Sequence, residues 1–188
     1  MARWPGVPHA FGWLSLDVRG QWRIKGTTVA HPGLSAFIGR HYAADGRGRW
    51  YFQNGPQRVY VTLACAPWVL RLGGSTGSSL FTHTGADAGR ARAAWIDEQG
   101  RLLLQCDVGI GLLDDRDLGL ACAALSRVDG SVADAYFLLR WMDGLEEPSL
   151  RLAVDWGGLA VQRIDSAALG KRFGFDPDPR PEPGEPEC

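Results

Sequence analysis

The 188-residue sequence contains no apolar run long enough to cross a membrane. Its longest strongly apolar, uncharged stretch lies between Leu63 and Leu70 and is interrupted by Pro67, whereas a membrane-spanning helix needs about 20 such residues. The first residues, Met1 to His9, include two prolines and a single charged side chain, without the apolar core of a secretory signal. We therefore expect a cytoplasmic protein without membrane spans.

Cysteine is scarce, which argues against a disulfide framework. The four cysteines are far apart in the sequence and form no Cys-x-x-Cys pair of the kind that binds zinc. In a reducing compartment such residues behave as small hydrophobic side chains. We expect Cys65, Cys106 and Cys122 to be buried and Cys188 to be a loose thiol.

Motifs for metal and nucleotide binding are absent as well. The four histidines form no His-Glu-x-x-His pattern, and no local spacing favours a zinc site assembled from His31, His41, His83 and Cys65, so we expect no cofactor. No Walker loop and no Gly-x-Gly-x-x-Gly motif opens a helix. The glycine-rich stretch 72–79 lacks the lysine of a phosphate-binding loop and is predicted to be a flexible loop.

What the sequence does contain is a recurring Asp-x-x-Gly module. It occurs at Asp17–Gly20, Asp45–Gly48 and Asp97–Gly100, each time between segments with apolar residues in alternation. Asp accepts hydrogen bonds from the backbone two residues further on, and Gly supplies a positive φ, so each module predicts a tight β-hairpin. With 45% hydrophobic residues and a net charge of −1, the chain has the composition of a globular, strand-rich protein.

The modules also align at longer range, which predicts an internal duplication. Superposing Asp17 on Asp97 brings further segments opposite one another: Pro32–Tyr42 with Asp114–Leu125, Asp45 with Asp129, Tyr51–Phe52 with Tyr136–Phe137, and Val59–Val61 with Leu150–Val154. We expect an α+β fold, mainly antiparallel, with two similar β-rich halves of one helix each. The predicted parts are an arm (1–12), a first repeat (13–92), a second repeat (93–175) and a tail (176–188).

Each half is expected to contain one short helix. The first begins at Pro32, because proline suits a first helical turn, and its apolar face comprises Leu34, Phe37, Ile38 and Tyr42. In the second half the acidic run Asp114–Asp117 is a candidate for divalent ions, but it precedes an apolar helical face. It is therefore predicted to be a helix N-terminus, followed by a face with Leu118, Cys122 and Leu125.

Proline alternates with acidic residues at the end of the sequence. Residues 176–188 contain a proline at almost every second position, and proline lacks the amide hydrogen that helices and sheets need. We expect this tail to be disordered and the folded part to end near Phe175. A further hypothesis is that the acidic tail folds back over the basic half of the chain and screens its charge.

Charge is distributed unevenly along the chain. Residues 1–92 contain 11 Lys and Arg against 3 Asp and Glu, whereas the acidic residues prevail in 93–175 and in the tail. Cations alternate with aromatic residues in the basic half, a composition that attracts anions. We expect a non-enzymatic module that binds an anionic small molecule or an acidic protein partner through Arg40, His41, Arg47, Arg49, Asn54 and Arg58. Trp50 and Trp68 are expected in the core or a pocket wall.

Several segments of the first half resemble a bacterial family of unknown function, DUF1285. They are Gly26–Val29, His31–Leu34, Asp45–Phe52, Pro56–Val61 and Ala66–Trp68. The resemblance implies a β-rich protein with repeated structural motifs and a role in ligand binding or signalling. Gln57 stands where members of that family usually have an acidic residue.

Three alternatives stay open beside this hypothesis. The two halves can neutralise one another by packing with complementary faces. An enzyme, either a hydrolase or a transferase, would need a site between the halves around His41, His83 and Asp114 or Asp115. Nucleic-acid binding is disfavoured, because the pI is near 6.4 and no RNA-recognition motif is present.

Overall fold

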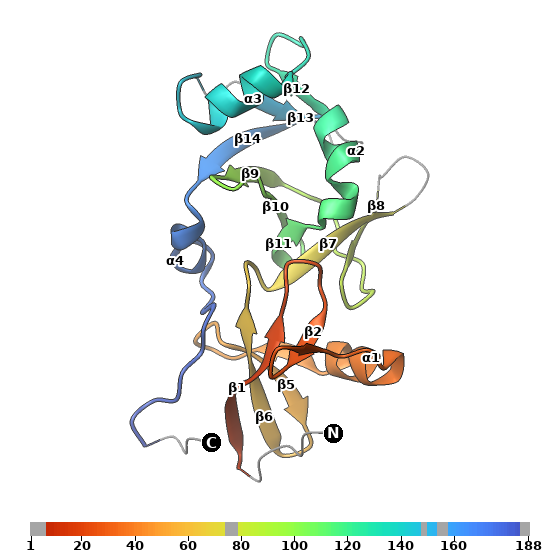
Figure 1. Cartoon of the computed structure of the whole chain (residues 1–188), viewed down its shortest axis with the longest axis vertical. Helices are drawn as coiled ribbons and strands as arrows, with labels where there is room; N and C mark the ends of the chain where they lie inside the picture. The colour runs from red at the N-terminus through yellow and green to blue at the C-terminus, as the bar shows by residue number, and fades with distance from the viewer. Residues whose placement is uncertain (1–6, 74–78, 148–149, 154–157, 185–188) are drawn as a thin grey trace. The chain divides into compact units, whose positions relative to one another are not determined.

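The computed structural model describes residues 7–73, 79–147, 150–153 and 158–184 (Figure 1). The chain forms two compact units. Unit 1 comprises residues 1–67 together with 170–188, and unit 2 comprises residues 68–169. Each unit is built on one sheet with short helices, which confirms the predicted α+β class. No helix in the described part of the chain is long and apolar enough to span a membrane.

Unit 1 contains a six-stranded sheet with the order β3-β2-β1-β6-β5-β4. All neighbouring strands are antiparallel except β1 and β6, which run parallel. The elements are β1 (His9–Leu16), β2 (Trp22–Ile24), β3 (Thr27–Thr28), α1 (Pro32–Arg40), β4 (Tyr42–Ala44), β5 (Trp50–Asn54) and β6 (Gln57–Leu63). Since β1 begins at His9, the N-terminal arm is shorter than the predicted 1–12.

Helix α1 starts where the sequence predicted. Pro32 occupies the first turn, and the Nδ1 atom of His31 accepts a hydrogen bond from the Leu34 amide, which caps the helix. Ile38 is fully buried, and the Phe37 ring contacts Phe52 of β5, so α1 covers one face of the sheet. Tyr42, predicted on the helical face, lies in β4 instead, because the helix ends at Arg40.

Unit 2 contains an eight-stranded sheet with the order β12-β13-β14-β9-β10-β11-β7-β8. Its strands are β7 (Trp68–Gly73), β8 (Ser79–Thr82), β9 (Ala93–Asp97), β10 (Leu102–Cys106), β11 (Gly109–Leu113), β12 (Leu125–Arg127), β13 (Leu150–Leu152) and β14 (Leu159–Ile164). The helices are α2 (Leu118–Ala123) and α3 (Ala135–Met142), with a 3-10 turn before α2 (Asp115–Asp117). Helix α4 (Leu169–Phe173) contains the last residue of unit 2 and leads back into unit 1.

The two sheets repeat one strand order, which supports the duplication. Strands β1 to β6 of unit 1 correspond in order and direction to β9 to β14 of unit 2, and the parallel pair β1 with β6 has its counterpart in β9 with β14. In unit 2 the strands that correspond to unit 1 begin at β9 (Ala93–Asp97). Residues 68–92, predicted in the first repeat, belong to unit 2, where β7 and β8 extend the sheet.

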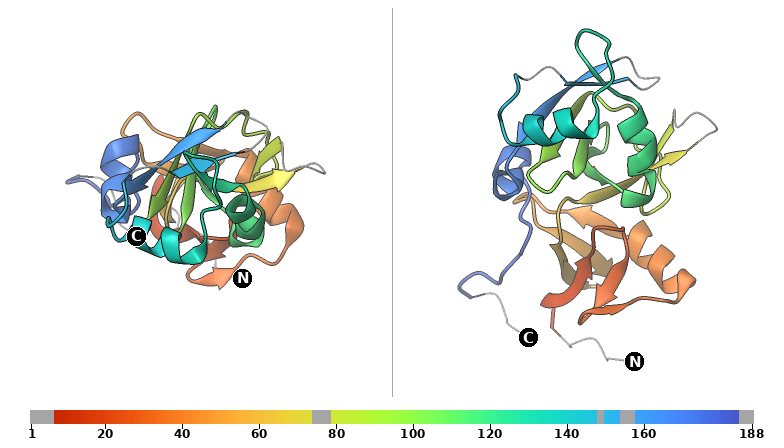
Figure 2. Two further views of the ribbon diagram at one scale, coloured as in Figure 1. Left: turned by 90° about the horizontal axis from the view of Figure 1, so that it is seen from above. Right: turned by 45° about the horizontal axis from the view of Figure 1, so that its top comes forward.

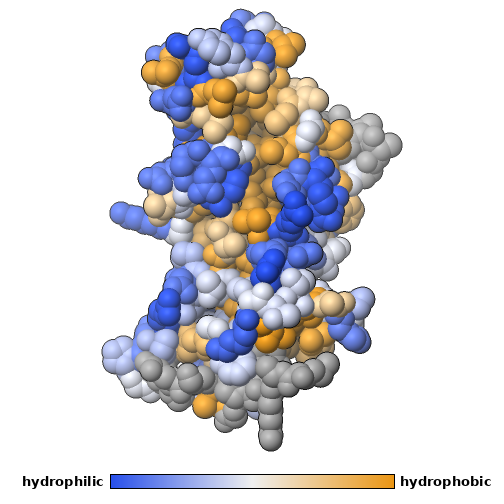
Figure 3. Space-filling model, viewed as in Figure 1, coloured by the Kyte–Doolittle hydropathy of each residue, from blue (hydrophilic) through white to orange (hydrophobic). Residues whose placement is uncertain are grey.

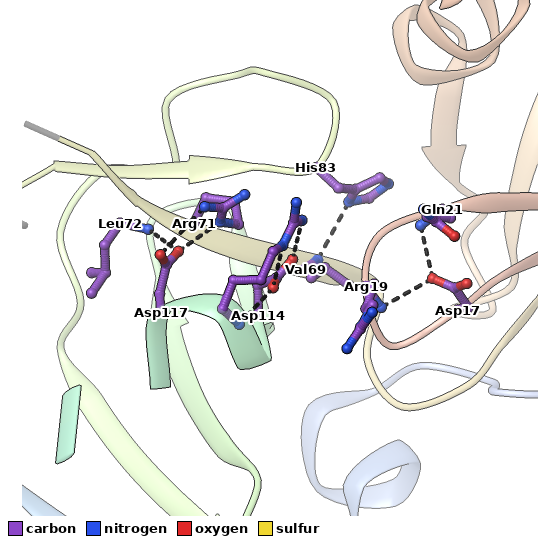
Figure 4. A network of polar contacts seen from close by, with 10 residues as sticks. Asp17, Arg19, Gln21, Val69, Arg71, Leu72, His83, Asp114 and Asp117 are labelled. Carbon is purple, nitrogen blue, oxygen red and sulfur yellow. Dashed lines mark hydrogen bonds and ion pairs between the residues drawn. The ribbon is translucent and has the colours of Figure 1, made fainter. Parts of the chain in front are cut away.

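All three Asp-x-x-Gly modules form the predicted hairpins. In each turn the Oδ1 atom of the aspartate accepts hydrogen bonds from the amides two and four residues further on, as Figure 4 shows for Asp17 with Arg19 and Gln21. The glycines Gly20, Gly48 and Gly100 have φ angles of 73°, 77° and 75°. Each module is thus fixed by the local chemistry of the aspartate and the glycine.

Residues 175–177 of the C-terminal segment pack on unit 1, although the sequence predicts a disordered tail from residue 176. Phe175 is buried in unit 1. The amide of Asp176 donates to the Gly48 carbonyl (3.0 Å), and the Leu63 amide donates to the Pro177 carbonyl (2.8 Å). Proline has no amide hydrogen but keeps its carbonyl, and this carbonyl satisfies the backbone amide of a buried residue. Residues 185–188, including Cys188, lie outside the described part.

Gly48 and Gly100 form a matched pair for a stability test. Alanine at Gly100 strains the positive φ but meets only Met142 at 3.5 Å, so we expect a loss of about 1–3 kcal/mol. At Gly48 the added Cβ would also lie 2.2 Å from the Gly174 carbonyl oxygen. Overpacking of this kind costs a further ~1–3 kcal/mol. Denaturant unfolding should therefore show a larger loss for Gly48→Ala than for Gly100→Ala, and equal losses would contradict the docking of the C-terminal segment.

Helix α3 is an element of unit 2 that the sequence analysis did not predict as a helix. It places Phe137 and Trp141 four residues apart, on the face that packs into the buried cluster of unit 2. Its other face exposes hydrophobic side chains, and the top of Figure 3 shows hydrophobic residues interspersed with hydrophilic ones. The exposed hydrophobic side chains of α2, α3 and the loops beside them are Leu120, Val128, Val132, Tyr136, Leu139 and Leu145.

Candidate functional site

The six predicted ligand residues all lie in unit 1, where the structure divides them between the two ends of β5. Arg47 and Arg49 belong to the hairpin turn before β5, and Asn54 and Arg58 flank the turn after it. The amide of Gln53 donates to the carbonyl of His41 (2.9 Å), which brings His41 to the Asn54 end. These six residues therefore do not form one compact cluster.

Arg49 has a structural role and is not available as a ligand residue. Its side chain is 10% exposed, and its Nε donates to the Oδ2 atom of Asp45 at 2.8 Å. Its Nη2 donates to the Tyr60 hydroxyl (3.1 Å), and the guanidinium lies over the Tyr60 ring. Burial raises the pKa of Asp45, but the hydrogen bonds from Arg49 and from the amide of Arg47 outweigh this effect and lower the pKa overall. Asp45 and Arg49 thus form a closed ion pair.

The other predicted residues near β5 are more exposed. Arg40 ends α1 with its side chain exposed, and the Nδ1 atom of His41 lies 2.9 Å from the carbonyl oxygen of Phe37. Asn54 and Arg58 are half-buried, whereas Gln57 is buried and donates from Nε2 to the Val7 carbonyl (2.6 Å).

Trp50 and Trp68 have structural surroundings, as predicted. Trp50 lies against Tyr42, with 4.7 Å between the ring centroids. In unit 2, the Nε1 atom of Trp68 donates to the carbonyl of Val108 (2.9 Å). Both indoles therefore belong to the packing of their own unit.

The face of the unit 1 sheet opposite α1 carries aromatic rings and cations. Phe52 points to α1, so its neighbour Tyr51 points to the other face, where Tyr60 is its partner in the pairing of β5 with β6. Phe11 of β1 stacks on Tyr60, with ring centroids 4.4 Å apart and planes at 5°. Arg58 of β6 lies over the Tyr51 ring at 4.6 Å. We call Phe11, Tyr51, Arg58 and Tyr60 the cation–aromatic face.

The cations of unit 1 outnumber the carboxylates that neutralise them. Residues 1–67 contain eight Lys and Arg but only two acidic residues, Asp17 and Asp45, which bind Arg23 and Arg49. Arg58 and Arg40 form no ion pair with any residue that the structure describes. Arg58 instead lies over the Tyr51 ring, and its guanidinium donates no hydrogen bond to any described residue, so it can bind an anion.

In unit 2 the acidic run of residues 114–117 forms a helix N-terminus and an ion-pair network, as Figure 4 shows. Asp114 is fully buried, caps the 3-10 turn through the Arg116 amide, and accepts two bonds from the Arg116 guanidinium. The hydrogen bond from Arg116 lowers the pKa of Asp114 to about 2 despite its burial. Asp117 binds Arg71 at 2.6 Å and the Leu72 amide at 2.9 Å. These carboxylates fix the start of α2 against β7.

His41, His83 and Asp114, the residues considered for an enzyme site, each form contacts within their own unit. His41 belongs to unit 1 and His83 and Asp114 to unit 2. The Nδ1 atom of His83 accepts a hydrogen bond from the Val69 amide (3.3 Å), and burial lowers the pKa of His83 to about 3. A base with this pKa is too weak for catalysis near neutral pH.

Unit 2 also contains a pocket with a volume of about 440 Å³. Its charged groups already have partners: Asp97 binds Arg101 at 2.6 Å, and the Nη1 atom of Arg163 donates to the carbonyls of Trp141 and Glu146. Glu98 accepts bonds from the hydroxyl and the amide of Ser166, which lower its pKa to about 2. The lining residues are Ile96, Asp97, Glu98, Met142, Arg163, Ile164 and Asp165.

The cysteines fit the prediction in part. Cys65 and Cys106 are buried thiols and form no disulfide, and burial, with a smaller contribution from Asp107, raises the pKa of Cys106 to about 12. Cys122 is exposed, which corrects the prediction, because α2 buries Ala121 instead. Among the described residues, no group of three His, Cys, Asp or Glu side chains could hold a metal ion.

The fold and the site together define a two-unit α+β protein with a repeated sheet and a cation–aromatic face. A DUF1285 family protein from Silicibacter pomeroyi DSS-3 has a similar structure: the TM-score is 0.53 at 13% identity, covering 83% of this chain and 82% of that one. This likeness confirms at the level of the fold the resemblance to DUF1285. A second DUF1285 family protein, from Shewanella baltica OS155, matches with a TM-score of 0.37 and 16% identity over 56% of this chain and 86% of that one.

The sequence itself identifies the family. A family described as "Protein of unknown function (DUF2946)" matches residues 1–180, and the chain belongs to it. No curated protein sequence matches the chain.

Proposed function

We propose that unit 1 is a non-enzymatic binding module that recognises an acidic protein partner through its cation–aromatic face. One observation carries the proposal: Arg58 is held on Tyr51 without a carboxylate partner among the described residues, on a unit whose first 67 residues have six more basic than acidic side chains. A cation that is already fixed on a ring loses little conformational entropy when it binds a carboxylate. The free energy of binding is therefore more favourable than for a mobile arginine.

The surroundings of this cation favour a protein over nucleic acid. The rings of Phe11 and Tyr60 stack on one another, and Tyr60 is only 1% exposed, so it is closed to a stacking base. Arg58 on this face is half-buried, and arginine binds carboxylates in a bidentate manner. Cys65, Cys106 and Cys122 are thiols and form no disulfide, which fits a reducing, cytoplasmic compartment.

Titration of the full chain with three anions tests the proposal. The probes are a hexaglutamate peptide, inorganic pyrophosphate and a single-stranded oligonucleotide, each at low and at high salt. We expect hexaglutamate to bind, with an affinity that falls as salt screens the charges. Arg58→Gln should weaken binding about fivefold, the effect of about 1 kcal/mol.

The matched control is Arg151→Gln, an exposed arginine on β13 of unit 2. It should leave the affinity for hexaglutamate unchanged. If Arg151→Gln and Arg58→Gln have equal effects, the attraction comes from overall charge and the proposed face is wrong. If the oligonucleotide or pyrophosphate binds more tightly than hexaglutamate, the partner is another kind of anion and not an acidic protein.

A further inference from the structure

The C-terminal segment of unit 1 consists of a firmly held part and a weakly held part. Residues 175–177, the anchor, contribute the buried ring of Phe175 and the two main-chain hydrogen bonds to Gly48 and Leu63. Residues 178–184, the arm, contact the unit through side chains: Thr62 donates to the Oδ1 atom of Asp178 at 3.4 Å, and Glu182 pairs with Arg47. The anchor is part of the fold, and the arm is laid on its surface.

The arm begins at one end of the cation–aromatic face. Thr62 follows Arg58 and Tyr60 at alternate positions of β6 and therefore points to the same side of the sheet. In Figures 1 and 2 the C-terminal segment runs along unit 1 on the side away from α1. Pro179 is buried, whereas Arg47 and Glu182 keep side-chain exposures of 60% and 49%. An acidic, proline-rich stretch thus lies beside Arg47 of its own unit and pairs with it through Glu182.

The polar contacts of Thr62 and Arg47 with side chains of the arm are weak enough to be exchanged, and the arm's apolar contact is the buried side chain of Pro179. An ion pair between exposed side chains stabilises by at most about fivefold in an equilibrium constant, and a hydrogen bond of 3.4 Å adds little. Salt screens the ion pair further. A partner that presents its own carboxylate to Arg47 can therefore displace the arm without unfolding the anchor.

We infer that the partner of unit 1 presents an acidic, proline-containing, extended segment that resembles the arm, and that the arm competes with it in cis. This inference rests on the proposed function and specifies its partner. Charge complementarity supports it, because the arm pairs an acidic residue with Arg47. The chemistry of the prolines supports it as well, since proline-rich segments are pre-extended and lose little entropy on docking.

The test compares the full chain with a released variant, Asp178→Asn/Glu182→Gln, that weakens the arm and leaves the anchor intact. The probe is a labelled peptide with the sequence of residues 176–184, and the control peptide has Asn and Gln in place of its acidic residues. We expect the released variant to bind the acidic peptide about tenfold more tightly than the unchanged chain does. Adding Arg47→Gln should remove most of this gain, whereas adding Arg151→Gln should not.

The outcomes separate this inference from the proposed function. Equal affinity of both chains for the acidic peptide, or equal binding of the control peptide, would show that the arm is no competitor. If hexaglutamate binds but the peptide does not, the inference fails and the proposed function survives. If neither binds, both fail. Sedimentation can also show that the released variant forms dimers and does not bind the peptide. The surface freed by the arm would then bind a second copy of the chain, and the inference would be wrong.

Discussion

Replacing Trp141 by alanine is expected to destabilise the protein by about 3–5 kcal/mol. Trp141 is 0% exposed and lies in the buried cluster of unit 2, where α3 packs on the sheet. The Arg163 guanidinium covers its ring at 5.2 Å. Because interiors are close-packed, the removed indole leaves a cavity that the rigid sheet cannot fill. Unfolding in guanidinium chloride, followed by far-UV circular dichroism, measures the loss.

Phenylalanine at the same position is the matched control. The Nε1 atom of Trp141 is buried and has no hydrogen-bond acceptor among the described residues. A buried unpaired donor is itself unfavourable, so Trp141→Phe loses part of the ring but also removes this cost. We expect a loss of at most about 1.5 kcal/mol. A loss as large as that of Trp141→Ala would mean that the indole N–H is hydrogen-bonded after all.

The hairpins were predictable because their causes are local. An aspartate that bonds the amides two and four residues on, and a glycine with φ near 75°, define the turn whatever the rest of the chain does. The start of α1 at Pro32 is local for the same reason. From three such turns the strand-rich class of the fold could be predicted.

The equivalences of single segments were less predictable, because they depend on pairing between distant residues. The sequence aligned Tyr51–Phe52 with Tyr136–Phe137, but the former are in strand β5 and the latter in helix α3. Two adjacent aromatic residues do not distinguish a strand from a helix; the spacing of four between Phe137 and Trp141 does. With α3 inserted, the counterpart of β6 by sheet order is β14 and not residues 150–154.

The sequence predicted the positive charge of the candidate site, but it did not predict which side chains share one face of the sheet. The excess of cations in the basic half was visible in the sequence, whereas the closed pair of Arg49 with Asp45 was missed, although the spacing of four residues within the hairpin module is a usable signal. Tyr51 and Gln53, and Arg58 and Tyr60, alternate along adjacent strands, and this period of two could have indicated the cation–aromatic face. The docking of the C-terminal segment depends on tertiary contacts of Phe175 and Pro177 that no local pattern encodes.

Acidification from pH 7 to pH 5 is expected to destabilise the protein by about 2 kcal/mol through His83. Its Nδ1 atom accepts the Val69 amide hydrogen bond and Nε2 is buried, so the folded ring stays neutral down to its pKa of about 3 (Figure 4). The unfolded chain binds a proton near the ordinary pKa of 6.5, and stability is therefore lost as the pH falls below this value. Thermal or denaturant unfolding at several pH values measures the slope.

The carboxylates act in a different range of pH, which makes the effect of His83 separable. Asp114 and Glu98 have folded pKa values of about 2, below the ordinary range of Asp and Glu, so the stability they contribute is lost only as the pH falls below about 4. Between pH 7 and pH 5 they are ionised in both the folded and the unfolded chain. In that window His83→Gln should flatten most of the pH dependence, because glutamine does not titrate. An unchanged slope in this variant would show that another group takes up the proton and that His83 can be protonated in the folded protein.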